Sequence, residues 1–122
     1  MDSEWNDSQP IYRQLRDRVV ALILEGLLRE GDPVPSVRNV AAEYRVNPLT
    51  VLKGYQSLVD EQVIEKRRGL GLFVNIGARD RLLLAERQKF LSDQWPQIAG
   101  IIQRLGLTPQ DLAITANSPK EG

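Results

Sequence analysis

The protein has neither cysteine nor histidine among its 122 residues. Without cysteine there are no disulfides, thiolate nucleophiles or zinc–thiolate sites, and without histidine the commonest general base and metal ligand are missing. The only clustered carboxylates are those of the adjacent Asp60 and Glu61. We therefore expect no catalytic residues, no metal site and no cofactor, and an enzyme is the least favoured class of function.

A long apolar run is also absent. No stretch approaches the roughly 18 residues that cross a bilayer, and the acidic start over residues 1–5 does not resemble a targeting segment. Hydrophobic residues make up 42% and charged residues 26% of the chain, as in ordinary folded proteins. We expect a cytoplasmic protein with no membrane partner, built as one domain or as one small domain with a helical appendage.

The chain has no surplus of charge, since 16 basic residues balance 16 acidic ones. The distribution is uneven: residues 1–9 hold three acids and no base, 10–76 hold ten bases against eight acids, and 77–122 hold six bases against five acids. Binding to nucleic acid would therefore depend on where individual Lys and Arg side chains lie and not on the field of the whole domain.

Apolar periodicity predicts a first helix from Pro10 to about Gly26. Proline suits the first helical turn, and glycine suits the left-handed residue that ends a helix. The residues at helical spacing are Ile11, Leu15, Val19, Leu22 and Ile23.

Two shorter helices follow, separated only by Arg45–Val46. Ser36 can cap the first, and Asn47 followed by Pro48 can open the second. Their apolar faces are formed by Val37, Val40, Ala41 and Tyr44, and by Val51, Tyr55, Leu58 and Val59. Such a pair of helices with a tight turn is typical of a helix-turn-helix.

The period changes after Gln62, where apolar residues 63–64 and 72–74 flank a basic, glycine-containing segment. This pattern predicts a β-hairpin, and Gly69 and Gly71 supply the positive φ angles that its tip requires.

Beyond Gly77 the pattern is helical again, with a break expected at Trp95–Pro96 because proline disfavours helical geometry in the residue before it. Gly106 is expected to end that helical segment. Residues 108–111, Thr-Pro-Gln-Asp, resemble a capping box for one last short helix through Leu112.

The order of these elements is that of a winged helix-turn-helix. We predict a mostly α-helical fold with a small β-hairpin wing and a short helical tail. The predicted divisions are an N-terminal extension over 1–9, a winged helix-turn-helix DNA-binding domain over 10–76, a helical dimerisation tail over 77–116 and a flexible C-terminus over 117–122.

The outward face of the third helix could enter a DNA major groove. It carries Leu49, Lys53 and Gln56, with Thr50 at its edge. The amino-terminal end of this helix is best placed for phosphates and base edges, because free N–H groups and the helix dipole favour anions there.

Four spaced motifs resemble the GntR family of bacterial transcriptional regulators. They read Pro10-Ile11-Tyr12-x-Gln14-Leu15, Gly31-Asp32-x-x-Pro35-Ser36-x-Arg38-x-x-Ala41, Val46-Asn47-Pro48-x-Thr50-Val51 and Arg67-x-Gly69-x-Gly71-x-Phe73-Val74. The tail is similar to the small YtrA-type branch, in which two helices replace a full effector domain and mediate dimerisation.

The resemblance implies that both short helices and the wing contact double-stranded operator DNA. The implied residues are Ser36, Arg38, Asn47, Thr50, Lys53, Tyr55, Arg67, Arg68 and Gly69. Helical periodicity also places Tyr55 in the core, which leaves its role open. A second interpretation of Arg67 and Arg68 is that their charges protect the edge of the hairpin from pairing with a strand of another molecule.

The sequence departs from the family pattern at several positions. Leu49 replaces a frequent Asn, so an apolar side chain that could touch a thymine methyl group stands where a hydrogen-bonding one is common. Gly54 replaces a usual Ala, at a helix cost of about 1 kcal/mol. Asn39, Gln62 and Leu72 stand where Glu, Gly and Thr are usual.

The tail is expected to form a homodimer, because two short helices cannot bury two apolar faces by themselves. The expected dimerisation residues are Leu83, Leu84, Phe90, Leu91, Trp95, Ile98, Ile101, Ile102 and Leu105. A tail of this size leaves little room for a typical metabolite pocket of about 300 Å³, so a small-molecule effector is expected to bind weakly or not at all.

The leading hypothesis is therefore a homodimeric transcriptional regulator, a repressor by expectation, bound to a pseudo-palindromic operator. The alternative is a winged module that binds protein and not DNA, motivated by the zero net charge and by Leu49 and Leu72 at expected contact positions. Salt dependence separates the two, because counterion release makes DNA affinity fall steeply with salt.

Overall fold

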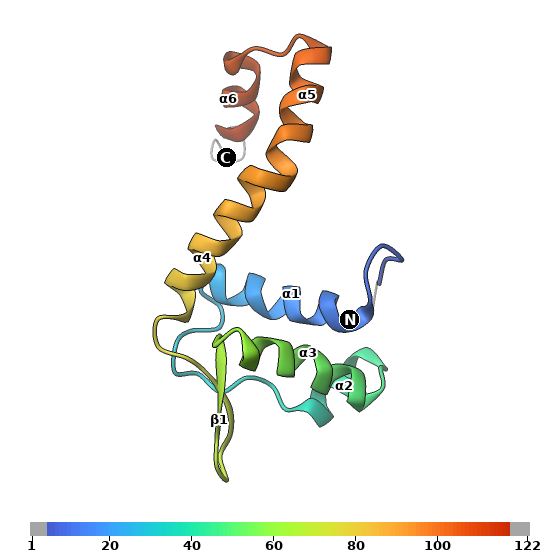
Figure 1. The fold of residues 1–122 in the computed structure, drawn as a ribbon, viewed down its shortest axis with the longest axis vertical. Coiled ribbons are helices and arrows are strands. Elements are labelled where there is room, and N and C mark those ends of the chain that lie inside the picture. The colour runs from blue at the N-terminus through green and yellow to red at the C-terminus, as the bar shows by residue number, and fades with distance from the viewer. Residues whose placement is uncertain (1–4, 118–122) are drawn as a thin grey trace. The chain divides into compact units, whose positions relative to one another are not determined.

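The structure is a computed structural model that describes residues 5–117. Over these residues the elements are α1 (Ile11–Leu24), α2 (Val37–Tyr44), α3 (Pro48–Asp60), β1 (Ile64–Arg67), β2 (Gly71–Val74), α4 (Ala78–Lys89), the π-helical turn η1 (Phe90–Gln94), α5 (Trp95–Leu105) and α6 (Pro109–Asn117) (Figure 1). The predicted winged helix-turn-helix with a helical tail is confirmed. In this described part of the chain no helix is both long and apolar enough to cross a bilayer.

The chain divides into two compact units, which meet within α4 between Leu84 and Ala85. This division falls later than the expected one after residue 76. The reason is that Ala78 and Leu82, on the first turns of α4, are buried in the core of the first unit. We refer to residues up to Leu84 as the first unit and to the rest as the second unit.

Local hydrogen bonds confirm the predicted end of α1 and the predicted starts of α2 and α3. Gly26 adopts φ +83°, which lets the N–H of Leu27 donate to the carbonyl of Leu22 at 2.9 Å and close α1. The Ser36 hydroxyl accepts from the N–H of Asn39 at 3.1 Å, and the Asn47 side chain accepts from the N–H of Leu49 at 2.8 Å. Both short helices are therefore capped by the residues that the sequence indicated.

The core of the first unit lies where α1 packs against α3, and these two helices run side by side in Figure 1. Val51 and Leu58 of α3 and Val74 of β2 are fully buried. Gly54 allows the close approach: a Cβ at this position would lie 2.9 Å from the carbonyl oxygen of Tyr12. Glycine at this position therefore lowers the helix propensity of α3 but allows α1 and α3 to pack closely.

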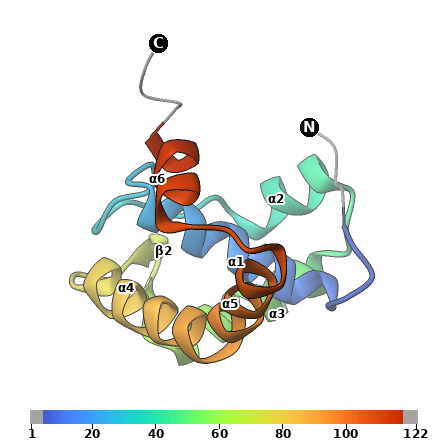
Figure 2. The same cartoon turned by 90° about the horizontal axis from the view of Figure 1, so that it is seen from above.

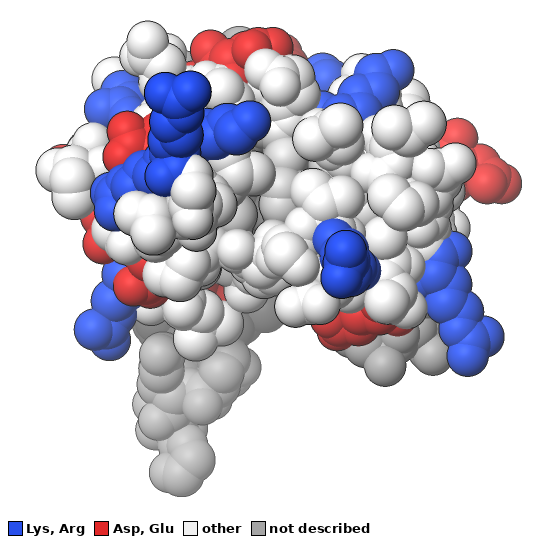
Figure 3. Space-filling view, turned by 90° about the horizontal axis from the view of Figure 1, so that it is seen from below, with Lys and Arg blue, Asp and Glu red and all other residues white. Residues whose placement is uncertain are grey.

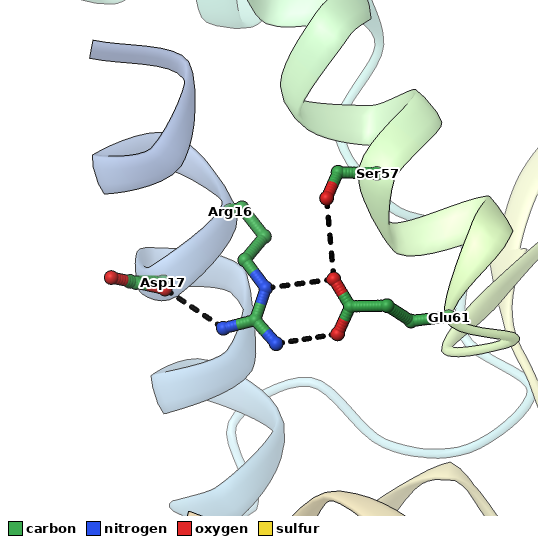
Figure 4. Close-up of polar contacts among 4 residues, drawn as sticks. All are labelled: Arg16, Asp17, Ser57 and Glu61. Atoms are coloured by element: carbon green, nitrogen blue, oxygen red, sulfur yellow. Dashed lines mark hydrogen bonds and ion pairs between the residues drawn. The ribbon is translucent and has the colours of Figure 1, made fainter. Parts of the chain in front are cut away.

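An ion pair also joins α1 to α3 (Figure 4). The guanidinium of Arg16 donates to both carboxylate oxygens of Glu61, with Nε 3.0 Å from Oε2, and to Asp17 at 2.8 Å. Ser57 donates to the same Glu61 carboxylate at 3.2 Å. The Arg16 guanidinium holds the pKa of Glu61 below its usual range, and Glu61 in turn raises the pKa of Arg16.

The antiparallel hairpin pairs Ile64 with Val74 and Arg67 with Gly71. Gly69 and Gly71 have φ angles of +76° and +111°, as the sequence predicted. Gln62, which stands where the resemblance expects glycine, also has a positive φ of +63°. Its carbonyl accepts from Asn75, directly after β2, at 2.8 Å and from Arg81 of α4 at 2.7 Å, so two side chains that follow the wing hold this strained residue.

The start of α4 is attached to the end of α1 and the loop after it. The Glu30 carboxylate accepts from the N–H of Arg79 at 3.2 Å, and the Arg79 guanidinium donates to the carbonyl of Leu24 at 2.9 Å. The N–H groups of Gly77 and Arg79 hold the pKa of Glu30 below its ordinary value. The positive amino-terminal end of α4 thereby faces a carboxylate, and the negative carboxyl-terminal end of α1 faces a guanidinium.

In the second unit the break expected at Trp95–Pro96 takes the form of the π-helical turn η1, which directly precedes Trp95. Proline has no N–H to donate, so it suits the first turn of a new α-helical segment. Gly106, at φ +65°, ends α5, and α6 then runs back in the opposite direction (Figure 1).

The capping box at the start of α6 is confirmed. The N–H of Thr108 donates to the Asp111 carboxylate at 2.9 Å, and the N–H of Asp111 donates to the Thr108 hydroxyl at 3.2 Å. The expected end at Leu112 is wrong, because α6 continues to Asn117. Neither glycine nor proline interrupts residues 113–117. The flexible C-terminus expected over 117–122 lies outside the described residues except for Asn117.

Candidate nucleic-acid interface

The amino-terminal turn of α3 projects between two open surface hollows. One, of about 440 Å³, lies between the starts of α1 and α3 and is lined by Tyr12, Leu49 and Lys53, among others. The other, of about 580 Å³, lies between α2 and α3 and includes Arg38 and Pro48. A helix end that stands free on both sides has the shape needed to enter a DNA groove.

The predicted contact residues on α2 and α3 differ in how available their side chains are for contact with DNA. Ser36 and Asn47 are exposed, but their side-chain oxygens cap the two helices. Arg38 and Leu49 are exposed, Leu49 at 70%, and Thr50 is half-buried. Ser36 and Asn47 therefore orient the helix ends, and Arg38 and Leu49 offer the freest side chains.

Lys53 lies beside Tyr12, with its Nζ 4.3 Å from the centroid of the tyrosine ring. The aromatic face attracts the ammonium group and restricts its position over the hollow between α1 and α3. Tyr12 thus belongs to this surface, although it was not among the predicted contact residues. The signal was present in the sequence, because Tyr12 lies within the first of the four motifs.

The two arginines of the wing lie in different surroundings. Arg67 is half-buried, with its guanidinium 4.4 Å from the Phe73 ring centroid and its Nε 3.0 Å from the Glu65 carboxylate. Arg68 and Gly69 are exposed at the tip of the hairpin. The wing therefore presents Arg68 outward, whereas Arg67 is engaged within the hairpin.

Tyr55 lies in the core, which is one of the two positions that the sequence left open for it, and not on the surface where the resemblance placed it. It is only 2% exposed, and its hydroxyl donates to the carbonyl of Pro35 at 2.7 Å. Burial raises the pKa of Tyr55 to about 12. Since Pro35 directly precedes the cap of α2, Tyr55 positions that helix from inside the core.

Charge on the winged side of the molecule is distributed sparsely. Figure 3, seen from the side on which the hairpin and α2 lie in Figure 1, shows one group of basic side chains with acidic ones beside it, and elsewhere single basic side chains divided by uncharged atoms. The surface therefore offers one local basic group and several single positive contacts, and not one continuous basic field, as the balanced composition suggested.

Comparison with known proteins identifies the family. The profile of the bacterial regulatory proteins of the gntR family matches residues 11–74, which span α1 to the end of the wing. The chain belongs to the GntR family. It is therefore a DNA-binding transcriptional regulator with a winged helix-turn-helix, as the four motifs implied.

Two Bacillus subtilis proteins are similar to this GntR-family chain. The uncharacterized HTH-type transcriptional regulator YhcF is 30% identical over 112 residues, covering 92% of this chain and 91% of YhcF. The HTH-type transcriptional repressor YtrA is 40% identical over 76 residues, covering 62% of this chain and 58% of YtrA. A solved transcriptional regulator from Oenococcus oeni matches with a TM-score of 0.71 at 29% identity, covering 94% of each chain.

The tail of this GntR-family regulator exposes most of the residues expected to form a dimer. Leu84, Leu91 and Leu105 are about 60% exposed or more, at 62%, 59% and 66%. Phe90, Trp95, Ile98 and Ile101 are exposed as well. Leu83 and Ile102 are half-buried. Leu83 and Leu84 belong to the first unit, and the other seven residues form an apolar face that the described helices of the second unit leave uncovered.

Residues 5–9, directly before the first residues of α1, contact the helices of the first unit. The Trp5 ring lies 5.7 Å from the ring of Tyr44, at the end of α2, and the two views of Figures 1 and 2 both place this segment beside α1. The side chain of Gln14 donates to the carbonyls of Asn6 and Gln9 at 2.9 and 2.8 Å. Sequence analysis missed this docking because the contacts join residues that helical periodicity does not relate.

Proposed function

We propose that this GntR-family regulator is a cytoplasmic homodimeric repressor that binds a pseudo-palindromic operator. The observation that carries the proposal is the free amino-terminal turn of α3 between two hollows, beside the exposed Arg38. The name of the similar YtrA, a transcriptional repressor, supports the direction of regulation.

In this proposal α3 enters the major groove and the hairpin contacts the DNA beside it. The side chains of Arg38, Lys53 and Arg68 bind phosphates, aided by the positive end of the α3 dipole, and these contacts supply most of the affinity. Leu49 meets a thymine methyl group and contributes preference for particular bases. Ser36, Asn47 and Tyr55 act by holding the two helices in position.

The homodimer is proposed from the second unit. Its exposed aromatic and branched side chains form a surface that a second copy can cover with the same residues, as a two-fold interface requires. Two linked winged domains then read two half-sites. We propose that no metabolite binds tightly within this tail, because a small helical unit whose apolar face forms the dimer interface has little interior for a binding pocket.

Substitution of Arg38 tests the DNA-binding surface. The protein would first select its preferred sequence from a pool of random duplexes, and fluorescence anisotropy would then measure the affinity of each variant for that duplex. Arg38→Ala is expected to cost about 1–3 kcal/mol of binding free energy. Arg29→Ala, which removes the same charge from a residue that lines neither hollow, is expected to bind almost as wild type. Equal affinity of Arg38→Ala and wild type contradicts the role of Arg38.

A protein partner is the second candidate function, favoured by two exposed leucines. Leu49 on α3 is 70% exposed and Leu70 at the wing tip is 71% exposed. Leu72, which the sequence also placed on this surface, instead packs against the core. A steep fall of affinity for the selected duplex with rising salt supports DNA binding, and failure to select any duplex at low salt supports the protein partner.

A further inference from the structure

The tip of the hairpin presents an apolar side chain to solvent. Leu70 is 71% exposed, and its N–H donates to the carbonyl of Arg67 at 2.8 Å, which closes the turn. Gly69 and Gly71 flank it, and a Cβ at either glycine would meet nothing within 4 Å. The leucine is therefore the only side chain over residues 69–71, and the tip of the hairpin is narrow.

The base of the hairpin is held on the edge of β2 that does not pair with β1. The loop between α1 and α2 lies along this edge: the N–H of Val34 donates to the carbonyl of Leu72, and the N–H of Val74 donates to the carbonyl of Asp32, both at 2.9 Å. Leu72 also packs against the core. Because Leu70 lies only two residues before this fixed position, the tip is a firm projection and not a free loop.

The length of α3 determines which groove of a duplex the tip reaches. This inference rests on the proposed DNA binding, in which the amino-terminal turn of α3 enters the major groove. A helix of 13 residues is about 20 Å long, and the hairpin follows its far end. Half a turn of B-DNA, which separates a major groove from the adjoining minor groove, is about 17 Å. Since the hairpin extends beyond α3 in Figure 1, its tip reaches that minor groove.

Leucine cannot read the polar base edges of a minor groove, because it has no hydrogen-bond donor or acceptor. Apolar side chains instead enter between neighbouring base pairs from the minor groove, where they unstack the bases and kink the duplex. In that position Leu70 leaves water for the apolar faces of the bases. The exposed Arg68 beside it supplies a cation for the phosphates at the edge of the groove.

We propose that Leu70 inserts between two base pairs in the minor groove next to each α3 contact and kinks the operator there. Leu70 then sets a sequence preference at a step that α3 does not touch, because pyrimidine–purine steps such as TA are the most easily kinked and unstacked. The same exposed side chain favoured the protein partner above, so a test of insertion also decides between the two uses of Leu70.

Unstacking of a base gives a direct measurement. Aminopurine is a fluorescent analogue of adenine whose emission rises when its stacked neighbours are lost. The selected duplex would carry a TA step with aminopurine in place of its adenine, moved one base pair at a time through the sequence beside the α3 contact. With the full-length protein bound, emission is expected to rise at one step, about five base pairs, or half a helical turn, from the most strongly selected bases. Anisotropy of the same samples measures binding.

Substitutions at the tip separate insertion from simple contact. Leu70→Ala is expected to abolish the rise in emission and also the preference for TA over GC at this step, which in wild type is about fivefold or more. Leu70→Met retains a long apolar side chain and is expected to retain both properties. Leu70→Lys is expected to bind the duplex through phosphates without the rise in emission.

Leu27→Ala is the matched control. Leu27 is 72% exposed, lies outside the wing and lines neither of the two hollows beside α3. This variant is expected to give the same affinity, the same rise in emission and the same preference for TA as wild type.

Two results would overturn the insertion of Leu70. One is a bound wild-type complex in which emission rises at no step, and the other is a rise of the same size in Leu70→Ala. Both leave the proposed function intact, because anisotropy shows that the duplex is bound. Failure to bind any duplex contradicts the proposed function itself, and the inference about Leu70 fails with it.

Discussion

The two units place their apolar side chains in opposite surroundings. In the first unit Val51, Leu58 and Val74 are fully buried. In the second unit no residue from Ala85 to Ala113 is buried, and Phe90, Trp95 and Ile101 are 39%, 43% and 42% exposed. Burial of apolar surface is the main favourable term in folding. The first unit therefore contains its own source of stability, whereas the second unit needs a surface outside itself.

The largest expected effect comes from removing a core side chain of the first unit. Leu58→Ala is expected to lower the free energy of unfolding by about 2–5 kcal/mol, because it removes buried methyl groups and leaves a cavity. Urea denaturation followed by circular dichroism would measure it. Leu91→Ala in the second unit, at a side chain 59% exposed, is expected to change the unfolding of the first unit by less than about 0.5 kcal/mol. A large loss in Leu91→Ala would break the contrast between the units.

A charge on the apolar face of the second unit tests the need for a partner copy. Ile101→Asp is expected to give a monomer in analytical ultracentrifugation, because an unpaired carboxylate would be buried at the dimer interface. Affinity for the selected duplex is expected to fall by about 100-fold or more as the avidity of two linked domains is lost. Gln103→Asp, an equally charged change at an exposed polar position on α5, is the control. An Ile101→Asp protein that remains dimeric would show that this face is not the interface.

The same glycine-to-alanine change is expected to have opposite effects in the two units. Gly54→Ala is expected to destabilise the first unit by about 1–3 kcal/mol, because the new Cβ would lie 2.9 Å from the Tyr12 carbonyl oxygen. Gly100→Ala on α5 would meet only the flexible end of Arg104, at 3.9 Å, and is expected to stabilise α5 by up to about 1 kcal/mol. Thermal unfolding of both variants measures the difference. Equal signs would contradict the packing argument.

The smallest expected effect is the pH dependence of the α1–α3 ion pair. The pKa of Glu61 is lowered in the folded state from its ordinary value of 4.5, so the pair stabilises the first unit above this pH. The contribution is lost as pH falls below about 4.5 and through the lower folded pKa, because the protonated carboxyl no longer pairs with Arg16. Glu61→Gln is expected to cost about 0.2–1 kcal/mol at pH 7.

Urea denaturation of wild type and Glu61→Gln across this pH range measures the ion-pair contribution. The difference between the two proteins is expected to shrink on acidification. Asp111→Asn provides the comparison in the second unit, where the Thr108 N–H lowers the pKa of an exposed carboxylate, and it is expected to leave the unfolding of the first unit unchanged. If the difference in unfolding free energy between wild type and Glu61→Gln stays constant from pH 7 to well below 4.5, the ion pair does not cause the pH dependence.

Most local elements could be predicted from the sequence because their determinants are close in the chain. Ser36, Asn47 and Gly106 set helix ends through hydrogen bonds and backbone angles within a few residues. The hairpin tip follows from Gly69 and Gly71 in the same way. The end of α6 was misjudged because the sequence has a clear starting signal there but no nearby stop.

The candidate interface was predicted less completely, because exposure depends on residues far apart in the chain. Arg38 and Leu49 are on the surface as expected, but the Tyr55 hydroxyl of α3 reaches back to the carbonyl of Pro35 before α2. The pairing of Lys53 with Tyr12 brings together residues from α3 and α1. No spacing rule within one helix contains this information.

The amino-acid sequence alone determined the order of helices and strands, the caps and turns that bound them, and the motifs that place the chain in its family, because these depend on short-range backbone geometry and side-chain period. Tertiary structure alone decided that Gly54 serves close packing, that the Tyr55 hydroxyl reaches the carbonyl of Pro35, and that the Arg18 guanidinium lies beside the rings of Trp5 and Tyr44. These outcomes depend on which surfaces meet when distant segments pack, and burial is a property of the assembled fold.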